Sequence, residues 1–87
     1  MPRVSKTIHA DEYPYFLELL FEVRRKAGVT QKDLAEAAGI SQQYVSSVER
    51  GNLRLDALQL RRWLHACGSD LGRFGRELER RLARAGY

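Results

Sequence analysis

The chain has little of what disulfide-bonded or metal-binding proteins need. Its 87 residues include one cysteine, Cys67, and two histidines, His9 and His65. A single cysteine excludes an intramolecular disulfide, and one cysteine with two distant histidines does not make a set of metal ligands. The sequence therefore predicts no metal site and no cofactor, and we expect a reducing, cytoplasmic setting for the protein.

Long apolar runs and the motifs of enzymes are also missing. No run approaches the roughly 20 residues that a membrane-spanning helix requires, and residues 1–10 lack the apolar segment of a signal peptide. There are no paired carboxylates and no glycine-rich phosphate-binding loop, and no segment alternates between apolar and polar residues as a strand does. We therefore expect an all-α protein that is not an enzyme and does not contact a membrane.

The charge of the chain is distributed unevenly. The net charge is +4, but residues 1–40 carry six basic and six acidic side chains, whereas residues 41–87 carry nine basic and five acidic ones. All the basic residues in the second part are arginines, whose planar fork suits phosphate oxygens. A chain of this length forms one small domain with a modest core. The composition is thus compatible with a polyanionic partner.

Helical spacing begins after the first ten residues. Residues 1–10 show no helical period and are predicted to form a flexible N-terminal arm. A first helix is predicted from Asp11, its N-cap, to Gly28, because Pro14 is tolerated in a first turn where its missing N–H would be unpaired anyway. The apolar stripe of this helix repeats at intervals of four, three and four residues. It consists of Phe16, Leu20, Val23 and Ala27.

Four further helices are predicted from capping residues and glycines. The residues that can cap their N-termini are Thr30, Ser41, Asp56, and Ser69 or Asp70. The glycines that can end three of them are Gly39, Gly51 and Gly68. The apolar residues predicted to pack the fourth helix on the others are Leu58, Leu60, Trp63, Leu64 and Cys67. We expect residues 11–68 to form the main domain and residues 69–87 a separate C-terminal helix.

The segment from Gln31 to Arg50 has the residue types of a helix-turn-helix in the required order. Two apolar helical faces flank Gly39, where a residue without Cβ adopts a positive φ at little cost. The faces are formed by Leu34, Ala35 and Ala38 and by Val45 and Val48. Ile40 is expected to fill the corner between the two helices. The second helix then presents short amides and hydroxyls that can reach base edges in a major groove.

Between about Leu17 and Leu71, the sequence resembles the Cro and phage-repressor (XRE-type) helix-turn-helix family. The resemblance is carried by the run RRKAGVTQKDLAEAAGIS, by the corner at Gly39, and by Glu49-Arg50-Gly51. It implies a compact, five-helix, lambda-repressor-like domain with the helix-turn-helix at its second and third helices. It also implies a sequence-specific regulator, most simply a repressor, that binds double-stranded DNA with its third helix in the major groove.

The resemblance implies a role for individual residues. Bases are expected to be read by Gln42, Gln43, Ser46 and Ser47. Phosphates are expected to be contacted by Thr30, Gln31, Lys32, Tyr44, Arg50, Asn52 and Arg54. The backbone N–H groups around Gly51 and Asn52 match a phosphate clamp of the family, and Gln31 also matches a residue that braces the start of the reading helix. Arg24 and Glu49 match a largely buried ion pair. Tyr44 has an alternative interpretation, in which it covers the edge of the core.

The predicted C-terminal helix carries a narrow apolar stripe with two interpretations. The stripe consists of Leu71, Phe74, Leu78 and Leu82. It either packs on the domain as a fifth core helix or meets its copy in a second chain. Dimerisation is favoured because a palindromic operator needs two copies. Both interpretations can hold if Leu71 and Phe74 dock inside the domain while Leu78 and Leu82 contact the second chain.

A second function remains open at this point. The chain could be the antitoxin of a toxin–antitoxin pair, which binds DNA and also neutralises a partner protein. Residues 1–12 or the final helix would then contact the toxin.

Overall fold

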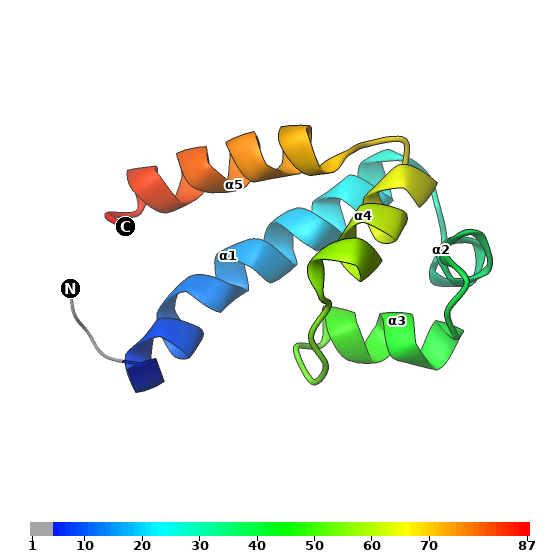
Figure 1. The fold of residues 1–87 in the computed structure, drawn as a ribbon, viewed down its shortest axis with the longest axis horizontal. Helices are drawn as coiled ribbons and strands as arrows, with labels where there is room; N and C mark the ends of the chain where they lie inside the picture. The colour runs from blue at the N-terminus through cyan, green and yellow to red at the C-terminus, as the bar shows by residue number, and fades with distance from the viewer. Residues whose placement is uncertain (1–4) are drawn as a thin grey trace.

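The computed structural model describes the backbone of residues 5–87 and the side chains from Asp11 onward. Within these residues the protein consists of helices joined by short connections, without strands, so the predicted all-α fold class is confirmed (Figure 1). The five helices are α1 (Ser5–Lys26), α2 (Gln31–Ala38), α3 (Gln42–Glu49), α4 (Ala57–Ala66) and α5 (Leu71–Arg84).

The first helix starts earlier than the sequence predicts. Because α1 begins at Ser5, the expected arm over residues 1–10 is wrong for residues 5–10, and residues 1–4 lie outside the described part of the chain. Pro14 lies inside α1 and not in its first turn. An interior proline removes its own N–H from the helical ladder, and its ring clashes with the carbonyl four residues earlier, at a cost of about 3 kcal/mol. Good helix formers such as Lys6 and Ala10 precede Pro14, and α1 continues on both sides of it despite this cost.

The predicted caps are confirmed at the other four helices. Side chains of the N-cap residues accept hydrogen bonds from backbone N–H groups three residues later, which are otherwise unpaired in a first turn. These pairs are Thr30 with Asp33, Ser41 with Tyr44, Asp56 with Gln59, and Asp70 with Arg73. Gly39 ends α2 with φ 73°, and its N–H donates to the carbonyl oxygen of Ala35. The sharp turn between α2 and α3 therefore forms where the sequence places it.

The helix-turn-helix residues predicted to be apolar and inward-facing form much of the core. Leu34, Ala35, Ala38, Val45 and Val48 are all buried, and Leu20, Trp63 and Leu64 are fully buried with them.

Two apolar residues predicted to lie on packed helix faces are exposed: Ala27, which follows the end of α1, and Leu58 of α4. Leu58 has 66% of its surface exposed. At about 100° per residue, Leu58 lies roughly 140° around α4 from the buried Trp63. The capped first turn of α4 therefore turns this leucine toward solvent.

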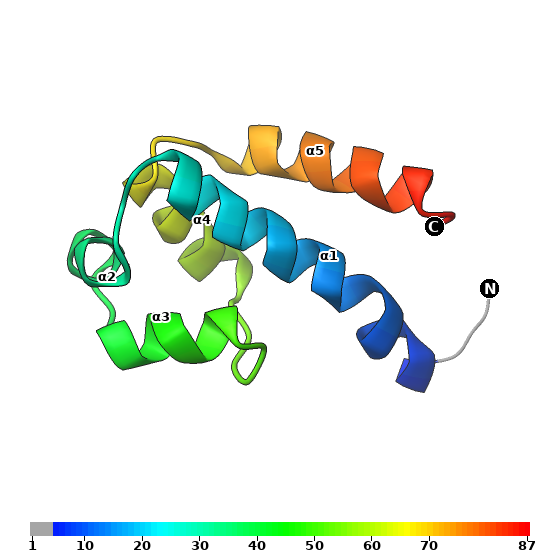
Figure 2. The same ribbon diagram turned by 180° about the vertical axis from the view of Figure 1, so that it is seen from behind.

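The last helix lies alongside the first and runs in the opposite direction (Figures 1 and 2). Phe74 is 4% exposed and packs edge-on against Phe16, with 5.5 Å between the ring centroids, and Leu78 packs against the core. Leu71, in contrast, is 38% exposed. The expected interface role of Phe74 is therefore wrong, because this residue belongs to the core of its own chain. The expectation that Leu71 docks inside is also wrong.

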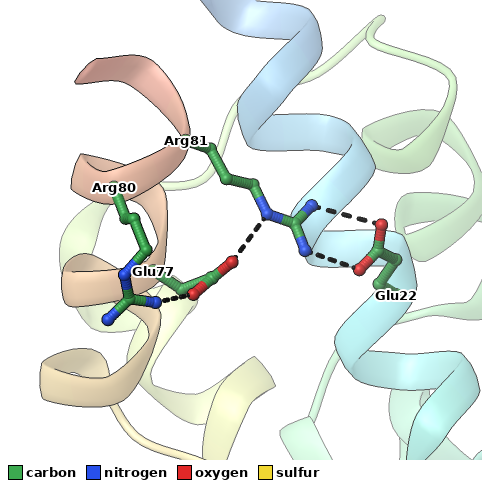
Figure 3. A network of polar contacts seen from close by, with 4 residues as sticks. All are labelled: Glu22, Glu77, Arg80 and Arg81. Carbon is green, nitrogen blue, oxygen red and sulfur yellow. Dashed lines mark hydrogen bonds and ion pairs between the residues drawn. The ribbon is translucent and has the colours of Figure 1, made fainter. Parts of the chain in front are cut away.

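An ion-pair network joins α5 to α1 (Figure 3). Arg81 donates from Nη1 and Nη2 to the carboxylate of Glu22 on α1, at 3.2 and 2.8 Å, and from Nε to Glu77 at 2.9 Å. Glu77 also accepts a hydrogen bond from Arg80. Hydrogen bonding to Arg81 holds the pKa of Glu22 below its ordinary value, and it does the same to the pKa of Glu77. The network therefore makes the docking of α5 dependent on pH.

We expect this dependence to appear in stability measurements. The lowered pKa of Glu22 means that its pairing with Arg81 stabilises the fold above the ordinary pKa of a glutamate. That contribution is lost as the pH falls through the lowered pKa. At pH 6, Glu22→Gln should reduce the free energy of unfolding by about 0.5–1 kcal/mol, and at pH 3 the difference should narrow. Urea unfolding at both pH values measures it. Glu18→Gln, on an exposed position of the same helix, is the control. A difference of the same size at both pH values would contradict the expectation.

Candidate nucleic-acid interface

Helix α3 lies along the edge of the molecule opposite α5 (Figures 1 and 2). Its inner side is held by Val45 and Val48, both fully buried. Its first two residues, Gln42 and Gln43, are exposed, and Ser46 and Ser47 are half-buried. The four predicted base-reading residues therefore lie together on the side of α3 away from the core, where a DNA groove can reach them.

The orientation of α3 is fixed by a polar cluster that joins three helices. Arg24 of α1 donates to both carboxylate oxygens of Glu49, from Nε at 2.7 Å and from Nη2 at 3.0 Å. Arg24 also donates from Nη1 to the carbonyl oxygen of Val29 at 2.9 Å. The two side chains are only 12% and 7% exposed. The predicted ion pair is thus present, and its two-pronged geometry fixes direction as well as distance.

Gln31 completes this cluster. Its Nε2 donates to Oε1 of Glu49 at 2.9 Å. The sequence comparison with the family predicts that Gln31 braces the start of the reading helix, and this is wrong: it braces the last residue of α3. Gln31 stands in the first turn of α2, and its side chain reaches Glu49, the last residue of α3. The first turn of α2 and the end of α3 are therefore locked together.

Tyr44 has a structural role that excludes its predicted contact with a phosphate. Its hydroxyl donates to the carbonyl oxygen of Arg54 at 3.0 Å, and its ring packs against the core. A tyrosine hydroxyl carries one proton, so this group has none left to donate to a phosphate. The phosphate-contacting role is therefore corrected to the alternative interpretation, in which Tyr44 covers the edge of the core and ties the connector after α3 to that helix.

The connector between α3 and α4 also uses its backbone donors internally. The N–H of Gly51 donates to the carbonyl oxygen of Val48, and the N–H of Asn52 donates to that of Ser47, both at 2.9 Å. The predicted phosphate clamp made by these two N–H groups is therefore wrong, because both donors close the end of α3. Gly51 has φ 84°, and a Cβ there would come within 3.2 Å of Leu17.

The predicted phosphate-contacting side chains that remain exposed lie at two places. They are Thr30 and Lys32 at the start of α2, and Asn52 and Arg54 in the connector after α3. The guanidinium of Arg54 lies 4.2 Å from the ring centroid of Tyr13, an arrangement typical of a cation–π contact. Each place can present a donor to a DNA backbone on either side of α3.

Arg50 lies apart from this set. Its guanidinium is folded back along α3 and donates to Oγ of Ser46, and from Nη2 to Oγ of Ser47 at 3.4 Å. The sequence reading missed this contact, although the spacing of three and four residues between the serines and Arg50 is the spacing of helical neighbours.

The described residues can also be compared with the requirements of a metal site, a reactive thiol and a membrane span. Within them, no group of three or more histidine, cysteine or carboxylate side chains could hold a metal ion. Burial raises the pKa of the Cys67 thiol, which disfavours the reactive thiolate. In the same part of the chain, no helix is long and apolar enough to cross a bilayer.

Comparisons with known proteins agree with this geometry. The family model described as helix-turn-helix matches residues 20–74, which contain α2, α3 and α4. A solved structure of an XRE-family like protein from Pseudomonas syringae pv. tomato str. DC3000 is 39% identical, with a TM-score of 0.78. The match covers 85% of this chain and 90% of that one. None of the curated proteins matches the sequence.

Proposed function

This chain belongs to the XRE-type helix-turn-helix family of DNA-binding regulators, and on that premise we propose that it binds specific double-stranded sequences through α3. The observation that carries the proposal is the outer side of α3. It bears the exposed amides of Gln42 and Gln43, which suit base edges, and the ion pair of Arg24 with Glu49 fixes the orientation of the helix. The simplest mode of action is repression, in which the bound protein occludes a promoter.

In the proposed complex, α3 enters the major groove with its N-terminal end foremost. Gln42 and Gln43 then face base edges, while the start of α2 faces the DNA backbone. Phosphate contacts from Thr30, Lys32 and Arg54 would set the register without selecting a sequence. This division of roles is supported by the exposure of all five side chains.

We further propose that two copies bind one operator. Helix α3 has eight residues, so it is about 12 Å long and spans roughly three to four base pairs. So short a contact selects few sites in a genome, whereas a second copy on a palindrome doubles the sequence that is read. Leu71, Leu78 and Leu82 remain the apolar residues of α5 that a homodimer could use.

The experiment that tests the proposed function is the selection of bound sequences from a random duplex pool. We expect enrichment of a palindrome whose half-sites are centred about one DNA turn apart. Recovery of a single half-site would contradict the two-copy arrangement. Recovery of the starting pool without enrichment would contradict sequence-specific binding itself.

Replacing Gln43 by alanine should reduce binding to the selected site by about 1–3 kcal/mol, because an amide can pair with an adenine through two hydrogen bonds. Binding to random duplex should change little. Lys32→Ala is the matched control, since a lysine near the backbone contributes on every sequence and its loss should weaken both complexes alike. Fluorescence anisotropy on both duplexes measures the effects. Equal losses on both duplexes for Gln43→Ala would show that Gln43 does not read sequence.

A further inference from the structure

We infer that Arg50 is a base-reading residue that selects guanine, not a phosphate ligand; this inference rests on the proposed binding of DNA through α3. The observation behind it is the position of the guanidinium. Two of its nitrogens donate to the hydroxyl oxygens of Ser46 and Ser47, so the charged group lies over the middle of α3 and not beyond its end.

The geometry of the helix explains why the side chain takes this path. Gln43, Ser46, Ser47 and Arg50 are separated by three and four residues and share one side of α3. The buried Val45 and Val48 occupy the other side. Long side chains on a helix lean toward its N-terminus. An exposed Arg50 therefore extends along the proposed base-facing side, toward Gln43.

The two serines hold the guanidinium but leave most of it free. A guanidinium has five N–H donors, and two of its nitrogens serve the serine contacts. The serines are too short to cover the arginine, and because their oxygens accept, each keeps its own proton. The remaining N–H groups can form the two-pronged contact with O6 and N7 of guanine, the commonest base-specific contact in the major groove. Ser46 and Ser47 are then positioning residues for Arg50.

This arrangement predicts a feature of the operator. The guanidinium lies three to four residues from Gln43 along α3, which is about 4.5–6 Å at 1.5 Å per residue. Base pairs are stacked about 3.4 Å apart. We therefore expect a guanine within two base pairs of the position whose identity depends on Gln43.

The test is selection from a random duplex pool with the unmodified protein, Arg50→Ala and the control Arg54→Ala. The unmodified protein and Arg54→Ala should enrich the same guanine, whereas Arg50→Ala should lose the preference at that position and keep the one that depends on Gln43. Ser46→Ala combined with Ser47→Ala should weaken the guanine preference. A uniform loss of affinity with an unchanged consensus for Arg50→Ala would overturn the inference and leave the proposed function standing. A pool without enrichment would overturn both.

A second measurement changes the DNA, and its main result comes from the unmodified protein. Replacing that guanine by 7-deazaguanine removes the N7 acceptor and leaves O6, so it should weaken binding of the unmodified protein by part of the about 5- to 150-fold that a whole two-pronged base contact is worth. The same replacement should have little effect on Arg50→Ala and its full effect on Arg54→Ala. Unchanged affinity of the unmodified protein for the 7-deazaguanine duplex would overturn the assignment.

Discussion

Glu49→Ala is expected to lower the free energy of unfolding by about 3–5 kcal/mol. The substitution leaves the guanidinium of Arg24 in a site where only 12% of its side chain is exposed, and removing one partner of a buried ion pair costs this much because the other charge stays uncompensated. Gln31 loses its acceptor at the same time. Urea unfolding followed by circular dichroism measures the change.

A double-mutant cycle separates this effect from simple loss of contacts. Arg24→Ala combined with Glu49→Ala removes both charges, so the double variant should lose less stability than the sum of the two single variants. Glu36→Ala, on an exposed position of α2, is the control and should change stability by less than about 0.5 kcal/mol. Additive losses in the cycle would mean that Arg24 and Glu49 do not stabilise each other.

The second large effect is expected at Phe74. Phe74→Ala should cost about 3–5 kcal/mol, the usual range when a large aromatic side chain is removed from a core. Phe74 is 4% exposed and packs edge-on against Phe16, so the substitution opens a cavity between α1 and α5. Thermal and urea unfolding at several protein concentrations measure the loss.

The dependence on protein concentration checks that Phe74 stabilises its own chain. If Phe74 belongs to the core of one chain, its loss should lower the unfolding midpoint equally at all concentrations. If Phe74 instead contributed to contacts between two copies, the loss caused by the substitution would grow with protein concentration. Leu71→Ala is the matched control on the same helix. At 38% exposure, it should cost less than about 1 kcal/mol.

The features that could be predicted from the sequence are those that depend on a few neighbouring residues. Thr30, Ser41 and Asp56 cap helices whose N–H groups lie three residues away, and Gly39 adopts a positive φ inside its own turn. Such contacts are local, so they do not depend on how the helices pack together. The resemblance to the family added the pair of Arg24 and Glu49, which are 25 residues apart and share no local pattern.

The features that could not be predicted depend on how whole helices are placed. An apolar stripe looks the same in sequence whether it meets its own chain or a copy, so the burial of Phe74 required the position of α1. Tyr44 and Arg50 could each contact either DNA or residues of the same chain. The sequence does not show which contact forms, because that depends on the path of the chain. Pro14 fits a first turn because its missing N–H would be unpaired there, and nothing in the residues before it shows that α1 begins at Ser5.

The side-by-side position of the first and last helices has a consequence for the order of folding. Glu22 and Arg81 are 59 residues apart, whereas Arg24 and Glu49 are separated by 25. The longer loop costs about 0.8 kcal/mol more entropy to close. During synthesis α1 emerges before α5, so the side of α1 that carries Phe16 stays uncovered until α5 has been made. The contacts that hold α3 can therefore form before α5 docks on α1.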